Sequence, residues 1–291
     1  MSKMNIRSRI ATLLDSLRKA LPLPVRNLAM RFLWGWYYLL DQVDNIRGRT
    51  MEMVPPRHLI YTIGSSFSPV GQEYLGYFKE LGRLAPDDIV LDIGSGVGRM
   101  ALPLTRYLSA HGRYEGFDIG EAGIRWCQQQ ITPRYPNFRF QHVALKNTFY
   151  TTKGTNAADF RFPYLDSTFD FVFATSIFTH LLPDAMQNYI AESVRVLKPG
   201  GRLLATFFLL NEESIALVMQ GKSSQNFIYD CGSYHTTNPQ VAEGAIAFPE
   251  TEVLAQFAKA GLIVERPIRY GNWCGRADYL SYQDILIARR A

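Results

Sequence analysis

Residues 90–99 read Val90-Leu91-Asp92-Ile93-Gly94-Ser95-Gly96-Val97-Gly98-Arg99, and this stretch is the strongest local signal in the sequence. An apolar strand runs into three alternating glycines, and a helix is expected to begin at the last one. Glycines permit a tight turn and let a ligand approach the backbone, while a helix start offers unpaired N–H donors. Dinucleotide-binding enzymes have a similar turn, usually spaced GxGxxG, which would need a glycine at Arg99.

Strand-like and helix-like segments alternate around this loop. The expected strands are 89–93, 114–117, 138–144, 169–174, 201–209, 263–265 and 283–288. The expected helices are 72–84, 98–110, 121–131, 183–197 and 250–260. Such alternation indicates an α/β fold with a mainly parallel sheet covered on both faces. We therefore expect a Rossmann-like, doubly wound sheet of seven strands, with a helical N-terminal extension.

Two segments interrupt the alternation, at 146–168 and 211–249. Long irregular segments in compact domains are often lids or binding loops, and both follow strand ends, where open α/β sheets bind ligands. The sequence predicts a basic, aromatic-rich extension over 1–50 and a catalytic domain over 51–291 that carries both insertions.

The composition is that of a soluble globular protein. Of 291 residues, 47% are hydrophobic and 20% are charged. The three cysteines (Cys127, Cys231 and Cys274) form no disulfide framework and no CxxC pattern, and we find no metal-binding spacing. We therefore expect a protein of the reducing cytoplasm without a bound metal.

The net charge of +5 is concentrated near the N-terminus. Residues 1–40 contain seven bases and one acid, which leaves 24 bases and 25 acids for the rest of the chain. A nearly neutral body argues against a nucleic-acid groove through the catalytic domain, so no nucleic-acid partner is expected.

The N-terminal arm is amphipathic. Residues 6–21 place leucines and isoleucines at helical spacing between basic flanks, and an aromatic run at 32–38 follows the interruption at Pro22 and Pro24. This pattern fits either an interfacial helix on the inner face of a membrane or a helix that packs on the catalytic domain or a second subunit. Residues 28–40 are too short for a membrane span and contain Arg31.

Four motifs in order carry a resemblance to a known family. The loop has the form D-x-G-x-G-x-G, and 114–119 place Asp118 at the end of the second strand. Residues 162–170 (FPYLDSTFD) lead into the fourth strand, and 196–203 (VLKPGGRL) precede the fifth. Residues 89–210 thus resemble class I S-adenosylmethionine-dependent methyltransferases, which implies S-adenosyl-L-methionine as cofactor.

The resemblance implies the cofactor contacts. The Asp118 carboxylate would bind both ribose hydroxyls, although it could instead cap the helix that starts near Gly120. Asn147 or Asp159 would contact the adenine. The remaining implied contacts come from the loop and from two strand ends: Asp92, Gly94, Ser95, Gly96, Gly98, Arg99, Ile119 and Thr175.

Three residues are candidates for catalysis. His180 follows the fourth strand and could act as a base, because histidine titrates near neutrality, or it could support the loop. Tyr234 and His235, in the long insertion, could bind or deprotonate an acceptor. Tyr229 is a further substrate-binding candidate. Trp273 and Arg276 could form a substrate wall or a tight turn with a packed tryptophan.

The sequence favours methyl transfer to an oxygen or nitrogen of a small polar acceptor, such as a saccharide or a lipid-linked molecule. A protein N-methyltransferase is the alternative within the class. A nicotinamide-dependent oxidoreductase is the alternative from another class, and the spacing at Arg99 and the LKPGG turn argue against it. Membrane docking with a vestigial cofactor site is disfavoured by the intact loop and Asp118. Residues 1–40 could contact a membrane or form a dimer.

Overall fold

The structure is a computed structural model that describes residues 23–47, 53–60, 67–147 and 154–291. The chain forms two compact units, Met1–Gly71 and Gln72–Ala291. The amphipathic segment 6–21 lies outside the described residues.

The first unit contains helix α2 (Leu23–Ile46) and the short helix α3 (Arg57–Ile60). Helix α2 begins within the interruption predicted at Pro22 and Pro24 and continues through the aromatic run. A proline is tolerated in the first helical turn, where its missing N–H would have no partner. Asp41 fastens α3 to α2, because its carboxylate accepts hydrogen bonds from the backbone N–H groups of Arg57 and His58, at 3.1 Å each.

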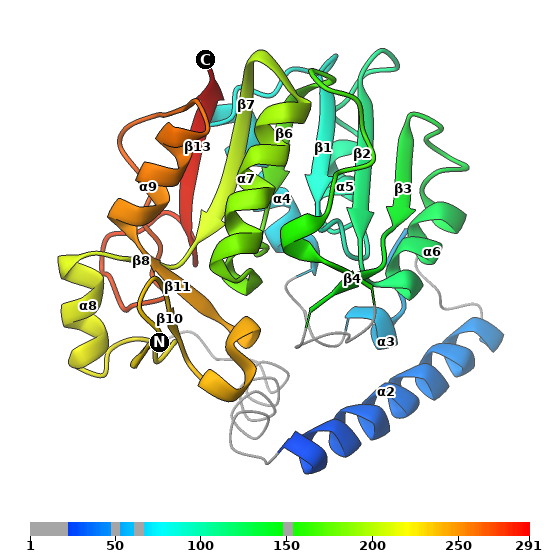
Figure 1. Ribbon diagram of the computed structural model, residues 1–291. Helices are drawn as coiled ribbons and strands as arrows, with labels where there is room; N and C mark the ends of the chain where they lie inside the picture. The colour runs from blue at the N-terminus through cyan, green and yellow to red at the C-terminus, as the bar shows by residue number, and fades with distance from the viewer. Residues whose placement is uncertain (1–22, 48–52, 61–66, 148–153) are drawn as a thin grey trace. The chain divides into compact units, whose positions relative to one another are not determined.

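The second unit is built on a seven-stranded sheet in the order β12-β13-β7-β6-β1-β2-β3. All neighbours are parallel except β13, which is antiparallel to both β7 and β12 (Figure 1). The strands are β1 (Ile89–Ile93), β2 (Arg113–Asp118), β3 (Phe138–His142), β6 (Phe169–Ala174), β7 (Leu197–Phe207), β12 (Leu262–Val264) and β13 (Asp284–Arg290). The predicted Rossmann-like fold is confirmed.

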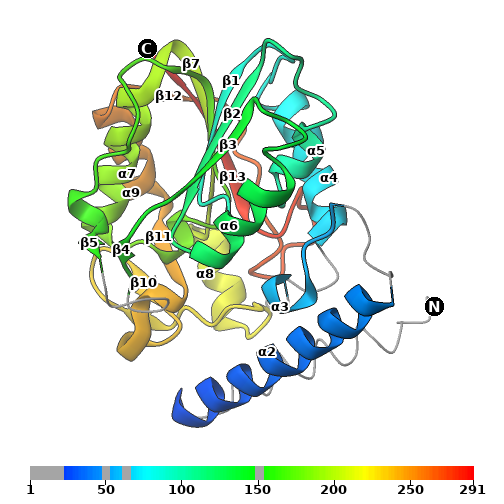
Figure 2. The ribbon, with the colours of Figure 1, turned by 90° about the vertical axis from the view of Figure 1, so that its right-hand side faces the viewer.

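Helices cover both faces of this sheet. Figure 2 shows α7 and α9 on one side and α4, α5 and α6 on the other. Their bounds are α4 (Phe67–Glu80), α5 (Ala101–Leu104), α6 (Glu121–Gln130), α7 (Pro183–Val196) and α9 (Glu250–Lys259). The helix expected over 98–110 is reduced to the single turn of α5, because Gly98 has φ +75° and Pro103 lacks an N–H.

The LKPGG segment differs slightly from its prediction as a turn. β7 already begins at Leu197, which pairs with Phe169, and the pairing resumes at Arg202 with Phe171 after a register shift. The intervening residues therefore bulge out of the ladder, where Gly200 adopts φ +76°.

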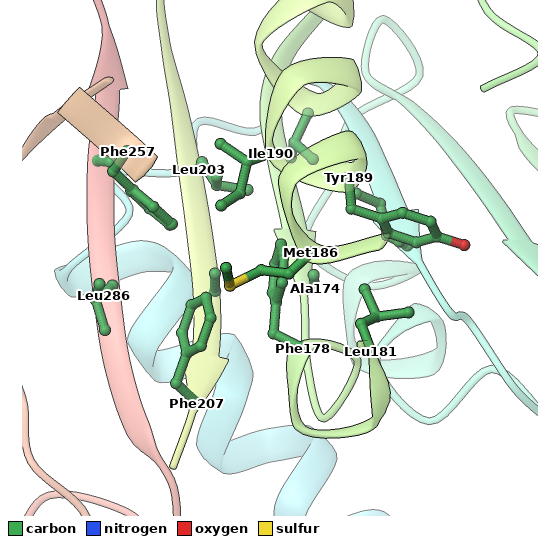
Figure 3. Packing of buried hydrophobic residues seen from close by; sticks show 14 of the residues in the cluster. Ala174, Phe178, Leu181, Met186, Tyr189, Ile190, Leu203, Phe207, Phe257 and Leu286 are labelled. Carbon is green, nitrogen blue, oxygen red and sulfur yellow. The ribbon is translucent and has the colours of Figure 1, made fainter. Parts of the chain in front are cut away.

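The core between the sheet and α7 and α9 is rich in phenylalanine (Figure 3). The rings of Phe178 and Phe207 stack with their centroids 4.7 Å apart, and Phe257 of α9 meets Phe207 edge-on at 6.0 Å. Met186 of α7 extends toward these rings. This packing fixes the segment after β6, which carries residues of the candidate site.

The insertion at 211–249 is more regular than expected. It forms helix α8 (Glu212–Met219), the 3-10 segment η4 (Pro239–Gly244) and strands β9 (Tyr229–Asp230), β10 (His235–Thr236) and β11 (Ile246–Pro249). These strands join β8 (Leu209–Leu210) in a second sheet, ordered β8-β11-β10-β9. Figure 1 shows this sheet at the end where the parallel strands finish.

The insertion at 146–168 is also ordered in its described part. β4 (Leu145–Lys146) pairs in parallel with β5 (Thr155–Asn156), and the 3-10 turn η2 (Ala157–Asp159) follows. Asn188 of α7 holds η2 in place by donating to the carbonyls of Ala157 and Phe160, at 2.9 Å each.

Within the described residues, none of the helices is both long and apolar enough to cross a membrane. The same part of the chain contains no group of three or more His, Cys, Asp or Glu side chains that could hold a metal ion.

Candidate active site

The glycine loop is an open cradle at the carboxyl end of β1. The N–H groups of Gly94 and Ser95 donate to the Phe117 carbonyl of β2, at 2.9 and 3.0 Å. Gly94 and Gly96 have φ +82° and +54°, so both need the conformational freedom of glycine. A Cβ at Gly96 would meet no atom within 4 Å, so the crest of the loop faces open space.

Two further glycines bring neighbouring elements close to this loop. A Cβ on Gly116 of β2 would lie 2.8 Å from the Cβ of Ser95, and one on Gly123 of α6 would lie 2.9 Å from the Gly96 carbonyl oxygen. Neither close approach was predicted from the sequence. A glycine inside a strand or a helix was the available signal, because such positions often mark close backbone approach.

Asp118 closes the loop from β2. Its Oδ2 accepts from the Gly96 N–H at 2.9 Å, and its Oδ1 accepts from the Gly120 N–H at 2.6 Å. Gly120, and not Asp118, occupies the N-cap position of α6, and no side chain caps that helix. The capping alternative is therefore wrong. Each carboxylate oxygen keeps a further lone pair, so the group can still accept two hydroxyl hydrogen bonds.

Asp92 lies beneath the loop and is almost completely buried. The Tyr114 hydroxyl donates to its Oδ2 at 2.5 Å, and its Oδ1 has no hydrogen-bond partner among the described residues. Burial raises the pKa of Asp92 to about 7, the nearby Asp118 charge adds to the rise, and the Tyr114 hydrogen bond opposes it.

Arg99 follows the loop and is half-buried. Burial lowers the pKa of Arg99, while the nearby Tyr74 and Asp92 favour its charged form. Burial raises the pKa of Tyr74 of α4 to about 12, and Tyr74 hydrogen-bonds Ser281. Burial is therefore the main effect that opposes the charge of the Arg99 guanidinium, and Tyr74 and Asp92 support that charge.

The segment after β6 contacts the glycine loop. A Cβ added to Gly94 would lie 2.0 Å from Cδ1 of Ile177, so this side chain rests directly on the loop. The preceding residue, Ser176, has φ +59°, which is unusual for a residue other than glycine. Strain of this kind persists where surrounding contacts enforce it, and it is frequent at functional sites.

A buried polar network holds Ser176. Its N–H donates to Thr206 Oγ1 at 2.8 Å, and both hydroxyls donate to Oε1 of Gln283, at 3.0 Å from Ser176 and 2.7 Å from Thr206. These residues come from the ends of β6 and β7 and from the residue before β13. This network was not predictable from the sequence, because its members are far apart in the chain.

His180 ends the 3-10 turn η3 (Phe178–His180) and is held by η4. Its Nδ1 lies 2.8 Å from the Glu243 carbonyl oxygen. A carbonyl only accepts, so Nδ1 carries the proton and Nε2 is the basic nitrogen of the neutral ring. Burial lowers the pKa of His180, which favours the neutral form. The residue thus has the protonation state that a general base requires.

The structure separates the two adenine candidates. Asn147 is buried, and its amide donates to the backbone carbonyl of His180 at 3.2 Å. Asp159 is exposed at the end of η2. Thr175 is buried at the end of β6, and Ile119, half-buried after Asp118, packs against the main core. Of the two candidates, only Asn147 contacts the His180 segment.

The second cluster lies on the second sheet. Tyr229 of β9 is exposed, and Tyr234 packs against the main core, where burial raises its pKa. His235 of β10 pairs in register with Asp230, and its Nδ1 lies 3.3 Å from the Phe227 carbonyl oxygen. These residues form one hairpin, in a different sheet from the glycine loop.

The interpretation of Trp273 and Arg276 as a substrate wall is corrected by their burial. Trp273 is completely buried, and its Nε1 donates to Asp284 Oδ2 at 2.7 Å. Arg276 pairs with Asp284 Oδ1 at 3.2 Å and with Glu213 at 2.7 Å. Both side chains fix the base of the second sheet, which is the packed alternative that the sequence also allowed.

Comparisons with known proteins agree with this fold. Residues 91–205 match a family model described as a methyltransferase domain. The chain is 30% identical to the ubiquinone/menaquinone biosynthesis C-methyltransferase UbiE of Hydrogenovibrio crunogenus, over 44% of this chain and 45% of that protein. It is 33% identical to phthiotriol/phenolphthiotriol dimycocerosates methyltransferase 1 of Mycobacterium ulcerans, over 40% of this chain and 36% of that protein. The matches thus span less than half the length of these relatives.

Among solved structures, the PH0226 protein from Pyrococcus horikoshii has a similar fold. Its TM-score is 0.51 at 19% sequence identity, and the match covers 79% of this chain and 98% of that one.

Proposed function

Since the chain belongs to the class I S-adenosylmethionine-dependent methyltransferases, we propose that it transfers a methyl group from S-adenosylmethionine to a small lipid-linked acceptor. One observation carries the proposal. Oδ2 of Asp118 accepts a hydrogen bond from the Gly96 N–H, and a Cβ at Gly96 would meet no atom within 4 Å, so the loop has room for a ligand beside this carboxylate.

The residues of the loop fit this cofactor. The Asp118 oxygens retain acceptor capacity for two ribose hydroxyls, and Gly96 leaves room for a ligand against the backbone. Arg99 offers a cation for the carboxylate of the methionine part. When bound, the cofactor supplies an electrophilic methyl group on a sulfonium with a good leaving group. The main task of this chain is then to align the acceptor with that methyl.

His180 is our candidate for the base. An acceptor hydroxyl, or a protonated amine, would transfer its proton to Nε2, because Nδ1 already donates to Glu243. With the cofactor bound, the oxygen or nitrogen would bond to the methyl carbon as the carbon–sulfur bond breaks. His180 lies three residues after Ile177, which rests on the glycine loop, so the two are fixed by the same turn.

The names of the two relatives support a lipid-type acceptor. One is named for ubiquinone and menaquinone biosynthesis and the other for dimycocerosates. We carry over only the acceptor class. The relative named as a C-methyltransferase keeps carbon as the alternative to oxygen or nitrogen, and a nuclear magnetic resonance spectrum of the methylated product distinguishes them.

The first experiment is isothermal titration calorimetry with S-adenosylmethionine and S-adenosylhomocysteine. Asp118→Ala should weaken binding about 30- to 1,000-fold, because it removes a charged acceptor of two hydroxyl hydrogen bonds. Asp278→Ala removes an exposed carboxylate and is the matched control, which should bind like the wild type. Absence of binding to a folded wild-type protein would refute the proposal.

A further inference from the structure

Helix α2 carries an apolar stripe along one face. At about 100° per residue, six positions fall within an arc of about 80°. They are Leu28, Phe32, Trp36, Leu39, Val43 and Ile46. Each of these side chains is between 40% and 86% exposed, so the stripe is not used to build the core of its unit.

The opposite face of α2 makes the ring contacts to α3, and its Trp34 and Tyr38 keep 44% and 40% of their surface exposed. Trp34 and Tyr38 stack on each other at 5.4 Å, and both meet the ring of His58 of α3 edge-on. Asp41 binds the same histidine, with its Oδ2 2.8 Å from Nδ1. Because α3 covers this face, the stripe is directed away from the contacts that hold the first unit together.

The charges around the stripe indicate which kind of surface it would bind. Both acids of α2, Asp41 and Asp44, pair with Arg57 of α3, and the stripe itself contains no acid. Arg47, just past the helix end, is exposed. The sequence from 1 to 40 adds seven bases and only one acid. An apolar stripe in basic surroundings complements an anionic lipid surface better than a neutral protein face.

The dimensions indicate a helix that lies in the plane of a membrane surface. From Leu28 to Ile46 the stripe is about 27 Å long at a rise of about 1.5 Å per residue. Within the described residues no helix can cross a bilayer. Trp36 adds an indole, which is favoured where apolar and aqueous phases meet.

We propose that the α2 stripe is a docking surface for an anionic lipid bilayer, with its six side chains at the boundary between headgroups and acyl chains. The inference goes beyond the proposed methyl transfer and does not depend on it. Basic residues of the arm attract the protein to the surface, and the stripe provides apolar burial.

The test is vesicle flotation of the full chain, using phosphatidylcholine vesicles with and without phosphatidylglycerol. The wild type should float with the anionic vesicles, less so at high salt. Phe32→Ser/Leu39→Ser should lower vesicle affinity at least about tenfold without changing net charge. The matched control is Leu165→Ser/Met219→Ser, which removes two side chains of the second unit that are 82% and 83% exposed.

Two outcomes would overturn the proposal. One is wild-type protein that does not float with anionic vesicles; a dimer that dissociates only in the stripe variant, measured by analytical ultracentrifugation, would then show that the stripe is an interface between copies of the chain. The other is equal loss of flotation in both double variants. Titration of S-adenosylmethionine into the stripe variant separates these outcomes from a failure of the proposed function, because the glycine loop is unaltered.

Discussion

A carboxyl group buried beneath the glycine loop makes stability depend on pH. The pKa of Asp92 rises from 3.8 to about 7 on folding. Between these values the native state keeps a proton that the unfolded chain has released, so the free energy of unfolding falls as pH rises from about 4 to 7. Asp92→Asn keeps an acceptor for the Tyr114 hydroxyl and cannot ionise.

We therefore expect Asp92→Asn to be more stable than the wild type above pH 7, by at most about 4 kcal/mol, and to lose the advantage toward pH 4. Urea unfolding at a series of pH values measures the difference. A difference that stays constant from pH 4 to pH 8 would show that the carboxyl is ionised in the native state.

His180 should determine the acidic limb of the activity profile. Burial lowers the pKa of His180 below its usual 6.5, so the base is neutral at physiological pH and is protonated only in more acid solution. His180→Asn should retain a donor for the Glu243 carbonyl and reduce kcat about 100- to 10,000-fold.

The measurement is kcat against pH for the wild type, His180→Asn and His235→Asn. The residual rate of His180→Asn should lack the acidic limb, and His235→Asn should keep it. If His180→Asn retains the wild-type limb, the histidine positions the turn and another group removes the proton.

At the level of elements, the glycine loop and the turn after β6 pack closely against each other at Gly94 and Ile177. A Cβ at Gly94 would meet the Ile177 side chain at 2.0 Å, whereas one at Gly96 would meet nothing. Both residues have positive φ, so alanine is strained at either position. Gly94→Ala should cost more stability than Gly96→Ala, by about 1–3 kcal/mol, because it adds overpacking to the strain.

Thermal unfolding of the single variants and of Gly94→Ala/Ile177→Ala measures this coupling. The double variant should recover part of the loss, because Ile177→Ala removes the clashing atoms. If the stability losses of Gly94→Ala and Ile177→Ala simply add in the double variant, the two positions are not energetically coupled, and the expected clash does not occur.

The second sheet depends on a buried ion pair. Arg276→Met leaves the Asp284 carboxylate without its cation and should destabilise the protein by about 3–5 kcal/mol. Arg289→Met, at an exposed position of β13, is the control. Urea unfolding gives the stability difference. An increase in acceptor KM without a stability loss would restore the substrate-wall interpretation.

Elements with strong local signals were predictable from the sequence. β1 and β6 have the expected bounds, 89–93 and 169–174, because a strand covered on both faces is a continuous apolar run between turn residues. The position of Asp118 followed from the end of such a strand. The short strands β9, β10 and β11 were missed, since two to four residues carry little periodicity and form through pairing with distant partners.

The buried polar groups were not predictable for a related reason. Gln283 accepts from Ser176 and Thr206, which lie 107 and 77 positions away in the chain. Asp284 likewise binds Trp273, whose sequence neighbours allowed either a substrate wall or a tight turn with a packed tryptophan. Only the sheet order brings these residues together, and no local pattern encodes it.

At the scale of the whole molecule, the two units contain different functional features. The net positive charge of the sequence is concentrated in 1–40, and the rest of the chain is nearly neutral. The first unit presents the apolar stripe, and the second contains the glycine loop, His180 and the second sheet. Docking and cofactor binding should therefore be separable by substitution.

The reversed direction of β13 has a consequence for how such a protein can diversify. Because β13 is antiparallel to β7, it starts at the edge where the parallel strands end, and 265–283 must reach that edge before the sheet is completed. Insertions at its exposed positions 277–279 would leave the registers of β7 and β13 unchanged. Selection can thus change the surface at these positions, while the contacts of Trp273 and Arg276 with Asp284 preserve the scaffold.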